Sequence, residues 1–129
     1  MLKFLLAVFL TFTTLLSHAQ ITTGCERINA YLPLLKGKKV AIIANHTTLF
    51  GDEHLVDVLI ENGVDIEYIL SPEHGFRGSA DAGEKVVGGR DSKTGLKVVS
   101  LYGSNKSPSD QIMGEIDVMV YDLQDVGVR

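Results

Sequence analysis

The chain has 129 residues, of which 45% are hydrophobic, and its formal net charge is −4 at pH 7. This length allows one small domain. The acidity is mild and dispersed along the chain, which argues against a nucleic-acid partner, because such a partner needs clustered Lys and Arg residues. The single cysteine, Cys25, excludes an intramolecular disulfide.

Residues 1–19 have the pattern of a secretory signal peptide. One lysine precedes an apolar run over residues 4–16, and Ser-His-Ala at 17–19 supplies a cleavage site. The apolar run is shorter than the about 20 residues that a membrane-spanning helix needs. We therefore expect cleavage after Ala19, a periplasmic or secreted protein, and no stable membrane span. A lipoprotein with the lipid on Cys25 is the alternative; otherwise this thiol should be buried and inert.

The first folded elements are a helix and a strand. Residues 25–37 (CERINAYLPLLKG) favour a helix, which Pro33 is expected to bend or shorten because proline lacks a backbone N–H. Residues 38–45 (KKVAIIAN) form an unbroken, β-branched apolar run. Such runs are typical of strands that are buried on both faces of a sheet.

A second helix and a second strand follow. Residues 52–63 (DEHLVDVLIENG) begin with acidic residues, place apolar side chains broadly on one side and end at a glycine, as helices do. His54 falls at the exposed start of this helix and should face solvent. Residues 64–70 (VDIEYIL) are the strand. Strand, helix and strand in so short a stretch indicate the βαβ unit of a parallel sheet.

The second half of the chain combines a long loop with two more strands. Residues 75–95 are rich in glycine and lack apolar periodicity, and such long loops are usually functional or disordered. Residues 96–103 (LKVVSLYG) and 116–123 (IDVMVYDL) return to a strand pattern, and residues 107–115 form a short helix with proline in its first turn. No closing element follows the last strand, so we expect a fragment of a longer protein.

These elements predict an α/β fold of Rossmann-like or flavodoxin-like type, with an incomplete parallel sheet in residues 20–129. Ligands of such sheets bind at the carboxyl ends of the strands. Four separate segments would bring polar side chains to this edge: Asn45 and His46, then Glu73 and His74, then Tyr102, then Asp122, Gln124 and Asp125. We therefore expect an active site there.

Glu73 is the best candidate for a catalytic acid. It follows an apolar strand and a proline, where packing could exclude water and raise the pKa of its carboxyl group. His74 would tune this acid or hold a substrate hydroxyl, or only bond to a backbone carbonyl. Arg77 offers a planar cation suited to a carboxylate, or is a plain surface residue. Glu84 is a further acid on the long loop.

Cofactor sites are not predicted. His46, His74 and Asp122 are the residue types that bind metals, but no HxxH or HExxH spacing occurs. The glycine-rich stretch VVGGRDSKTG matches neither the dinucleotide fingerprint nor the P-loop. Nucleotide binding is therefore not expected.

The motifs ANHT, SPEHGFRG, AGE, DSKTGLKVVSLYG and DVMVYDLQDVGVR occur in the order and spacing of a known family. Over residues 24–129 the chain resembles the NamZ-like exo-β-N-acetylmuramidases, formerly a domain of unknown function. It departs at Cys25, where an aliphatic residue is usual, and at His46-Thr47, where an Asn-Pro-Thr-like turn is common. The resemblance implies a two-domain enzyme that releases N-acetylmuramic acid from the non-reducing ends of peptidoglycan fragments. This chain is similar to most of its Rossmann-like first part, and the active site would lie in the cleft between the two parts.

The family's catalytic glutamate falls on Glu73, which fits the chemistry, because glycoside hydrolysis needs a protonated carboxyl group and a second group that manages the developing charge. The second group would be Asp122, Asp125, Glu84 or the acetamido group of the substrate. Alternatively, Asp122 only bonds to loop amides and Asp125 only caps the next turn. Arg77 would hold the lactyl carboxylate of the muramic acid. The other expected substrate-binding residues are Asn45, His46, His74, Glu84, Tyr102 and Gln124.

Two other functions stay open from the sequence. One is a non-catalytic module that binds cell-wall sugars on the same sheet edge. The other is a metal-dependent periplasmic hydrolase that uses His46, His74 and Asp122.

Overall fold

The computed structural model describes residues 21–72, 75–78 and 88–123. Their elements, in chain order, are α2 (Ile28–Leu35), β1 (Lys39–Ala44), β2 (Leu49–Phe50), β3 (Glu53–His54), α3 (Leu55–Glu61), β4 (Asp65–Ser71), β5 (Gly89–Arg90), β6 (Lys97–Ser100), α4 (Asp110–Glu115) and β7 (Val118–Asp122). A five-stranded sheet has the order β5-β6-β4-β1-β7, and β2 and β3 form a separate hairpin. The fold is mixed α/β, as the sequence predicted.

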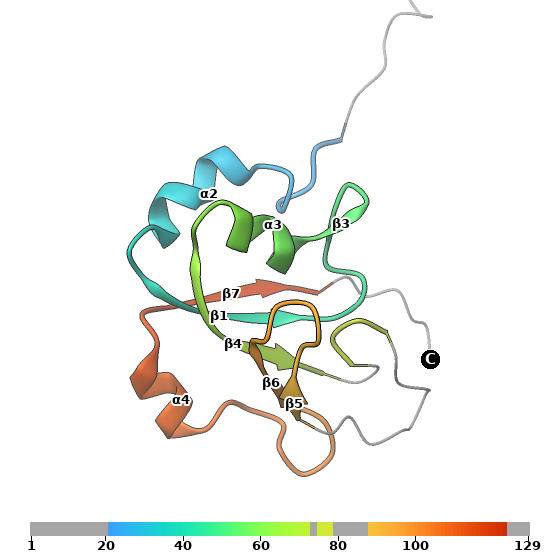
Figure 1. Ribbon diagram of the computed structural model, residues 1–129, viewed down its shortest axis with the longest axis vertical. Helices are drawn as coiled ribbons and strands as arrows, with labels where there is room; N and C mark the ends of the chain where they lie inside the picture. The colour runs from blue at the N-terminus through green and yellow to red at the C-terminus, as the bar shows by residue number, and fades with distance from the viewer. Residues whose placement is uncertain (1–20, 73–74, 79–87, 124–129) are drawn as a thin grey trace, which may run out of the picture.

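The sheet is mostly parallel. β1 pairs in parallel with β4 on one side and with β7 on the other, and β4 pairs in parallel with β6. Within this five-stranded sheet, as far as the structure describes it, only the short β5 is antiparallel to its neighbour. Because β1, β4, β6 and β7 run in the same direction, their carboxyl ends lie at one edge of the sheet (Figure 1).

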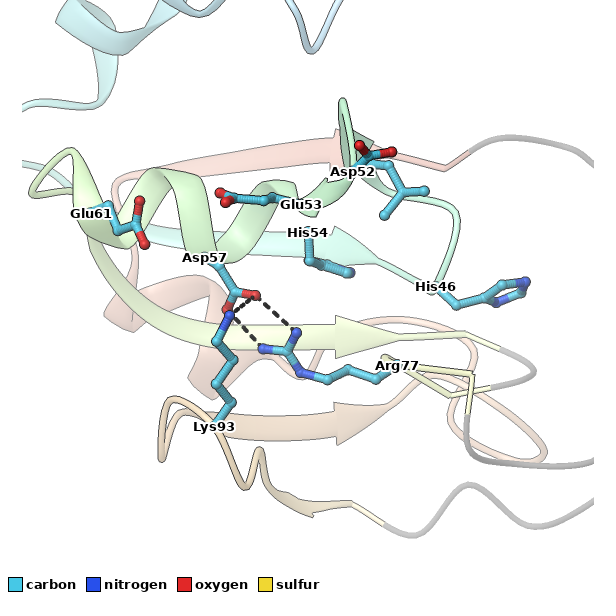
Figure 2. A pocket seen from close by; sticks show the side chains of 9 residues that line it. His46, Asp52, Glu53, His54, Asp57, Glu61, Arg77 and Lys93 are labelled. Carbon is cyan, nitrogen blue, oxygen red and sulfur yellow. Dashed lines mark hydrogen bonds and ion pairs between the residues drawn. The ribbon is translucent and has the colours of Figure 1, made fainter.

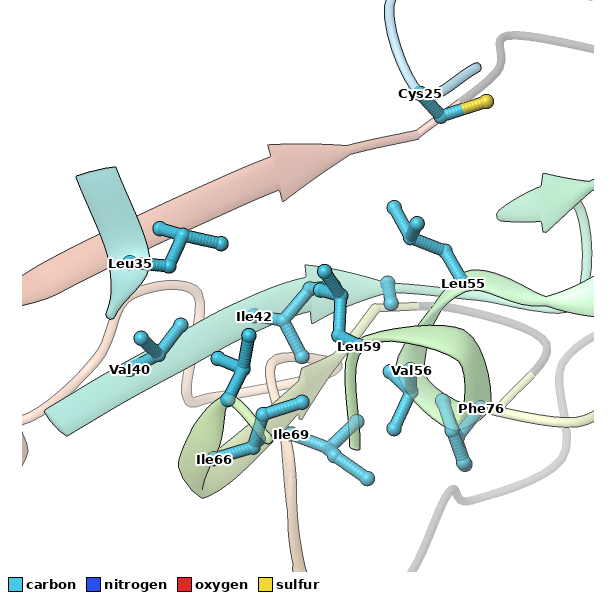
Figure 3. Close-up of a cluster of buried hydrophobic side chains, with 12 residues drawn as sticks. Cys25, Leu35, Val40, Ile42, Leu55, Val56, Leu59, Ile66, Ile69 and Phe76 are labelled. Carbon is cyan, nitrogen blue, oxygen red and sulfur yellow. The ribbon is translucent and has the colours of Figure 1, made fainter. Parts of the chain in front are cut away.

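Helices cover both faces of this sheet (Figure 1). α2 and α3 lie on one face, where Val40, Ile42 and Ala44 of β1 pack with apolar side chains of α3 and β4 (Figure 3). α4 lies on the other face, where Ile112 packs with Ala41 of β1 and with side chains of β4. Burial on both faces explains why the sequence of β1 is apolar without interruption. Ile42 is fully buried, and burial of such a side chain stabilises the fold by roughly 1.5–3 kcal/mol.

An irregularity in β4 changes which face its side chains meet. Val40 pairs with Ile66, but the next residue of β1, Ala41, pairs with Tyr68, so the register passes over Glu67. The extra residue places Ile66 and Ile69 in the same core, although they are three positions apart. A regular strand would have put them on opposite faces.

Two predicted helix starts are wrong. The helix expected from residue 52 begins at Leu55, because residues 49–54 form the β2–β3 hairpin, whose turn contains Gly51 with a φ of 61°. The helix expected from residue 107 begins at Asp110, so the proline precedes the first turn. Ser109 is the N-cap, and its side chain accepts a hydrogen bond from the backbone N–H of Ile112.

Other expectations concern the helix at residues 25–37, the loop at residues 75–95 and Cys25. The predicted helix at residues 25–37 is shorter, at Ile28–Leu35, with Pro33 inside it. The predicted loop at 75–95 contains β5, a strand too short to produce a sequence pattern. Cys25 is buried, as expected, and its Sγ donates to the carbonyl oxygen of Leu49 at 3.1 Å.

The expected leader, residues 1–19, lies outside the described residues. None of the helices that the structure describes has the length and apolar character needed to cross a membrane.

Candidate active site

The carboxyl edge of the sheet carries several of the residues that the sequence singled out. Asn45 and His46 follow β1, Tyr102 follows β6, and Asp122 is the last residue of β7. The four parallel strands therefore end at one edge, as predicted. The roles of these residues in catalysis or substrate binding stay predictions. Five other predicted site residues lie outside the described part of the chain: Glu73, His74, Glu84, Gln124 and Asp125.

The turn after β1 is fixed by its own polar side chains. The Asn45 Oδ1 accepts hydrogen bonds from the backbone N–H and the hydroxyl group of Thr47, at 2.9 and 2.7 Å. This is the local bonding by which asparagine shapes turns. The hydroxyl group of the fully buried Thr48 donates to the carbonyl oxygen of Asp122 at 2.6 Å and accepts from the N–H of Asn45. The turn is thereby tied to the end of β7.

His54 is buried, and its predicted exposure to solvent is wrong. It is the N-cap of α3: its Nδ1 accepts a hydrogen bond from the backbone N–H of Val56. The other ring nitrogen, Nε2, therefore carries the proton and donates to the carbonyl oxygen of Asn45 at 2.9 Å. Burial lowers the pKa of His54, which agrees with a neutral ring. His54 thus joins the start of α3 to the carboxyl end of β1.

Asp122 has an unusual environment for a carboxyl group. Its Oδ2 is buried and has no hydrogen-bond partner among the described residues. Burial raises the pKa of Asp122, and the nearby His54 partly offsets this. A half-buried carboxyl group with a raised pKa at the edge of a sheet has the character of a functional group rather than of a solvated surface acid.

The raised pKa of Asp122 predicts a pH-dependent effect on stability. The folded state holds the proton more tightly than the unfolded state, so this term favours folding at low pH and is lost as the pH rises through the folded-state pKa. At pH 7 the buried charge opposes folding. We expect Asp122→Asn to raise the Tm of the full-length protein at pH 7, and the difference from wild type to shrink toward pH 4. Thermal unfolding across this pH range measures it.

The control for this substitution is Asp65→Asn, at the exposed start of β4. It removes a carboxylate at the opposite edge of the sheet and should leave the Tm unchanged within error. An Asp122→Asn protein that is less stable than wild type at pH 7 would contradict the prediction, since it would mean that the carboxylate is paired in the folded protein.

The segment Gly-Phe-Arg-Gly, residues 75–78, is anchored at three successive positions. Phe76 is buried in the core and packs edge-on against the ring of His54, with the ring centroids 4.4 Å apart. Arg77 lies between two aspartates. Gly78 has a φ of 71°, and a Cβ at this position would lie 3.0 Å from the Cβ of His46. This motif, which was predicted from the sequence to be a catalytic loop, therefore also contains residues that fix its backbone to the rest of the fold.

Arg77 uses both edges of its guanidinium group. It binds the carboxylate of Asp57, on α3, through two hydrogen bonds of 2.8 and 3.0 Å, and that of Asp91 through two of 2.7 and 2.9 Å. Lys93 donates to Asp57 as well, at 2.9 Å (Figure 2). Arg77 lowers the pKa of both aspartates. Of the five N–H groups of an arginine, these bonds leave one for a substrate.

A polar hollow of about 370 Å³ lies beside this ion cluster. Of the predicted site residues, His46 and Arg77 line it, together with Leu49, Asp52, Glu53, His54, Asp57, Glu61 and Lys93 (Figure 2). In the described part of the chain, no three His, Cys, Asp or Glu side chains are grouped as metal ligands would be. The predicted metal alternative includes His74, which is not described, so it stays a prediction.

Four residues of this region were not predicted as site residues from the sequence: His54, Asp57, Asp91 and Lys93. Two of them had a signal in the sequence. His54 directly precedes an apolar helical run, which is the position of an N-cap. Asp57 interrupts that run on a face that is otherwise buried. A charged residue at such a position normally has a partner.

Comparisons with known proteins agree with the resemblance seen in the sequence. Residues 40–129 match the family model described as exo-beta-N-acetylmuramidase NamZ, N-terminal. The chain is 40% identical over 116 residues to a protein of Bacillus subtilis (strain 168) named peptidoglycan beta-N-acetylmuramidase NamZ. This match covers 85% of the chain and 27% of the relative.

Two crystal structures of DUF1343 family proteins from Bacteroides fragilis NCTC 9343 are also similar. One has a TM-score of 0.69 at 41% identity and covers 86% of this chain and 28% of its own. The other has a TM-score of 0.68 at 38% identity and covers 81% and 26%. The chain thus spans about a quarter of the length of these relatives. Because the family model matches well over half of its residues, the chain belongs to the NamZ family of exo-β-N-acetylmuramidases, of which it matches the N-terminal part.

Proposed function

We propose that the chain is the N-terminal part of an exo-acting glycoside hydrolase that releases N-acetylmuramic acid from the non-reducing ends of peptidoglycan fragments. The observation that carries this proposal is the 40% identity, over 116 residues, to a peptidoglycan β-N-acetylmuramidase. The sheet supports it, since parallel strands bring polar residues to one edge, where ligands of such folds bind. The action on chain ends and the substrate are part of the proposal.

In this proposal Glu73 is the general acid and base. In the sequence it stands two residues after Ser71, the last residue of β4, and it lies outside the described residues. Asp122 is the best described candidate for the second group. Its buried Oδ2 lacks a partner among the described residues, so it could accept a hydrogen bond from the acetamido N–H of the substrate. Asp125 and Glu84 are the alternatives.

We propose that the protein acts outside the cytoplasmic membrane. Residues 1–19 have the pattern of a signal peptide, and peptidoglycan is an extracytoplasmic polymer. The periplasm or the outside of the cell is therefore the proposed location, and muramyl saccharides are the proposed partners.

Product analysis with the full-length protein tests the function. The substrates are two peptidoglycan oligosaccharides of equal length, one with N-acetylmuramic acid and the other with N-acetylglucosamine at the non-reducing end. We expect one free N-acetylmuramic acid per chain from the first, none from the second, and no change after removal of metals with EDTA.

Each other outcome points to a different function. Binding of the first substrate without release would favour a sugar-binding module. Activity that EDTA abolishes and that added Zn²⁺ restores would favour a metal-dependent hydrolase. Release from the middle of the chain would contradict the exo-acting mode.

A further inference from the structure

Arg77 belongs to a compact ion cluster that it shares with Asp57, Asp91 and Lys93. Asp57 and Asp91 are each only 7% exposed, whereas Lys93 is exposed. The cluster contains two negative and two positive charges, so it is neutral as it stands. The guanidinium group also lies over the ring of Phe76, 4.7 Å from its centroid. Each polar edge and one face of this cation are therefore occupied by groups of the protein.

This environment opposes the binding of a substrate carboxylate by Arg77. To bind it with two hydrogen bonds, the arginine would have to leave one aspartate, and a buried carboxylate that loses its partner strongly destabilises the folded protein. Binding without such a release would add a third anion to the cluster. Asp57 and Asp91 both accept two hydrogen bonds from the same arginine, which is a geometry suited to fixing the backbone that carries it.

The cluster connects three parts of the chain. Arg77 lies four residues after Glu73, in the segment that leaves β4. Asp57 belongs to α3. Asp91 shapes the turn before β6, because its Oδ2 accepts hydrogen bonds from the backbone N–H and the hydroxyl group of Thr94. Residues 75–78 are thus held through Arg77 against a helix on one side and against a turn on the other.

We propose that Arg77 is a positioning residue, which fixes residues 75–78 to α3 and to the turn at residues 91–94, and that it acts on catalysis through this segment rather than by contact with the substrate. This inference rests on the proposed function. In this inference Arg77 binds the carboxylates of Asp57 and Asp91, and not the lactyl carboxylate of the substrate that the sequence-based hypothesis gave it.

Steady-state kinetics of the full-length protein test the inference. The variants are Arg77→Lys, which keeps the charge but loses the two-sided fork, Asp91→Asn, Asp57→Asn and the double variant Arg77→Lys/Asp57→Asn. We expect each single variant to reduce kcat by about tenfold to a hundredfold, the range for a slightly misplaced group, with KM changed by less than about twofold. The double variant should lose less than the product of the two single effects, because the two substitutions share the Arg77–Asp57 interaction.

Three controls separate positioning from general damage. Arg27→Lys and Asp65→Asn, at exposed positions outside the site, should keep wild-type kinetics. Asp57→Glu restores a carboxylate and should recover part of the kcat lost in Asp57→Asn. Kinetics are measured well below the Tm of each variant. Arg77→Lys and Asp91→Asn, which keep most of the cluster, provide the comparison should Asp57→Asn fail to fold.

A different pattern would overturn the inference. If Arg77→Lys raised KM and left kcat unchanged, and Asp57→Asn and Asp91→Asn kept wild-type kinetics, then Arg77 would contact the lactyl carboxylate. An active protein with wild-type kinetics in every variant would also contradict a positioning role. A wild-type protein that releases no N-acetylmuramic acid would instead contradict the proposed function, before any variant is compared.

Discussion

Glu73→Gln is expected to slow the release of N-acetylmuramic acid by the full-length protein by about 10²–10⁴-fold, the usual contribution of general acid–base catalysis. Glutamine has nearly the shape of glutamate and can still donate a hydrogen bond, but it cannot transfer a proton to the leaving oxygen. Substrate binding should therefore be kept, and KM should change little. Initial rates over a range of substrate concentrations measure both quantities.

The pH dependence makes this test more specific. A general acid must be protonated, so wild-type kcat/KM should fall as the pH rises above the pKa of the acid. Residual activity of Glu73→Gln should lack this alkaline limb. Glu67→Gln, at a half-buried position of β4 outside the proposed site, is the matched control and should resemble wild type. A Glu73→Gln protein with wild-type turnover would remove Glu73 as the acid.

His54→Ala is expected to lower the free energy of unfolding at pH 7 by about 2–4 kcal/mol. The substitution removes the N-cap of α3, worth about 1 kcal/mol. It also leaves the carbonyl oxygen of Asn45 without its hydrogen bond, at a cost of about 1–3 kcal/mol. Denaturant unfolding of the full-length protein measures the change. His54→Asn, which keeps a good capping group, should recover about half of the loss.

The stability that His54 provides should depend on pH in a definite direction. Burial lowers the pKa of His54 in the folded state, so the unfolded state binds the proton more readily. The contribution is complete above the unfolded-state pKa, near 6.5, and is lost as the pH falls below it. The gap in stability between wild type and His54→Ala should therefore narrow from pH 7.5 to pH 5. A gap that stays constant would show that the imidazole takes no part in acid destabilisation.

The parallel sheet could be predicted from sequence because its central strands are buried on both faces. Every residue of β1 after Lys39 is apolar, and so are four of the seven residues of β4, which is the pattern that burial produces. The β2–β3 hairpin could not be predicted in the same way. Its strands have two residues each, and Glu53 and His54 look like the acidic start of a helix. A pairing between Leu49 and His54 overrides that local preference.

The site could be predicted only as far as topology determines it. The direction of the strands brings their carboxyl ends to one edge, and of the predicted site residues Asn45, His46, Tyr102 and Asp122 are described at these strand ends. The partners of Arg77 come from positions 57 and 91, in a helix and in a turn that no local pattern connects to it. A charged residue in a motif looks the same in sequence whether it binds a ligand or other side chains of the protein.

The place of β1 in the sheet has a consequence for the order in which the chain folds. β4 can join β1 early, but the other neighbour, β7, is made nearly 80 positions later, and the links from Lys39 to Asp117 and from Thr48 to Asp122 wait for it. Until then one flank of the most apolar strand is uncovered. Long-range closures of this kind slow folding and expose nascent chains to association. A chain in which β7 has not yet paired with β1 should therefore associate with other unfolded chains more readily than the native protein does.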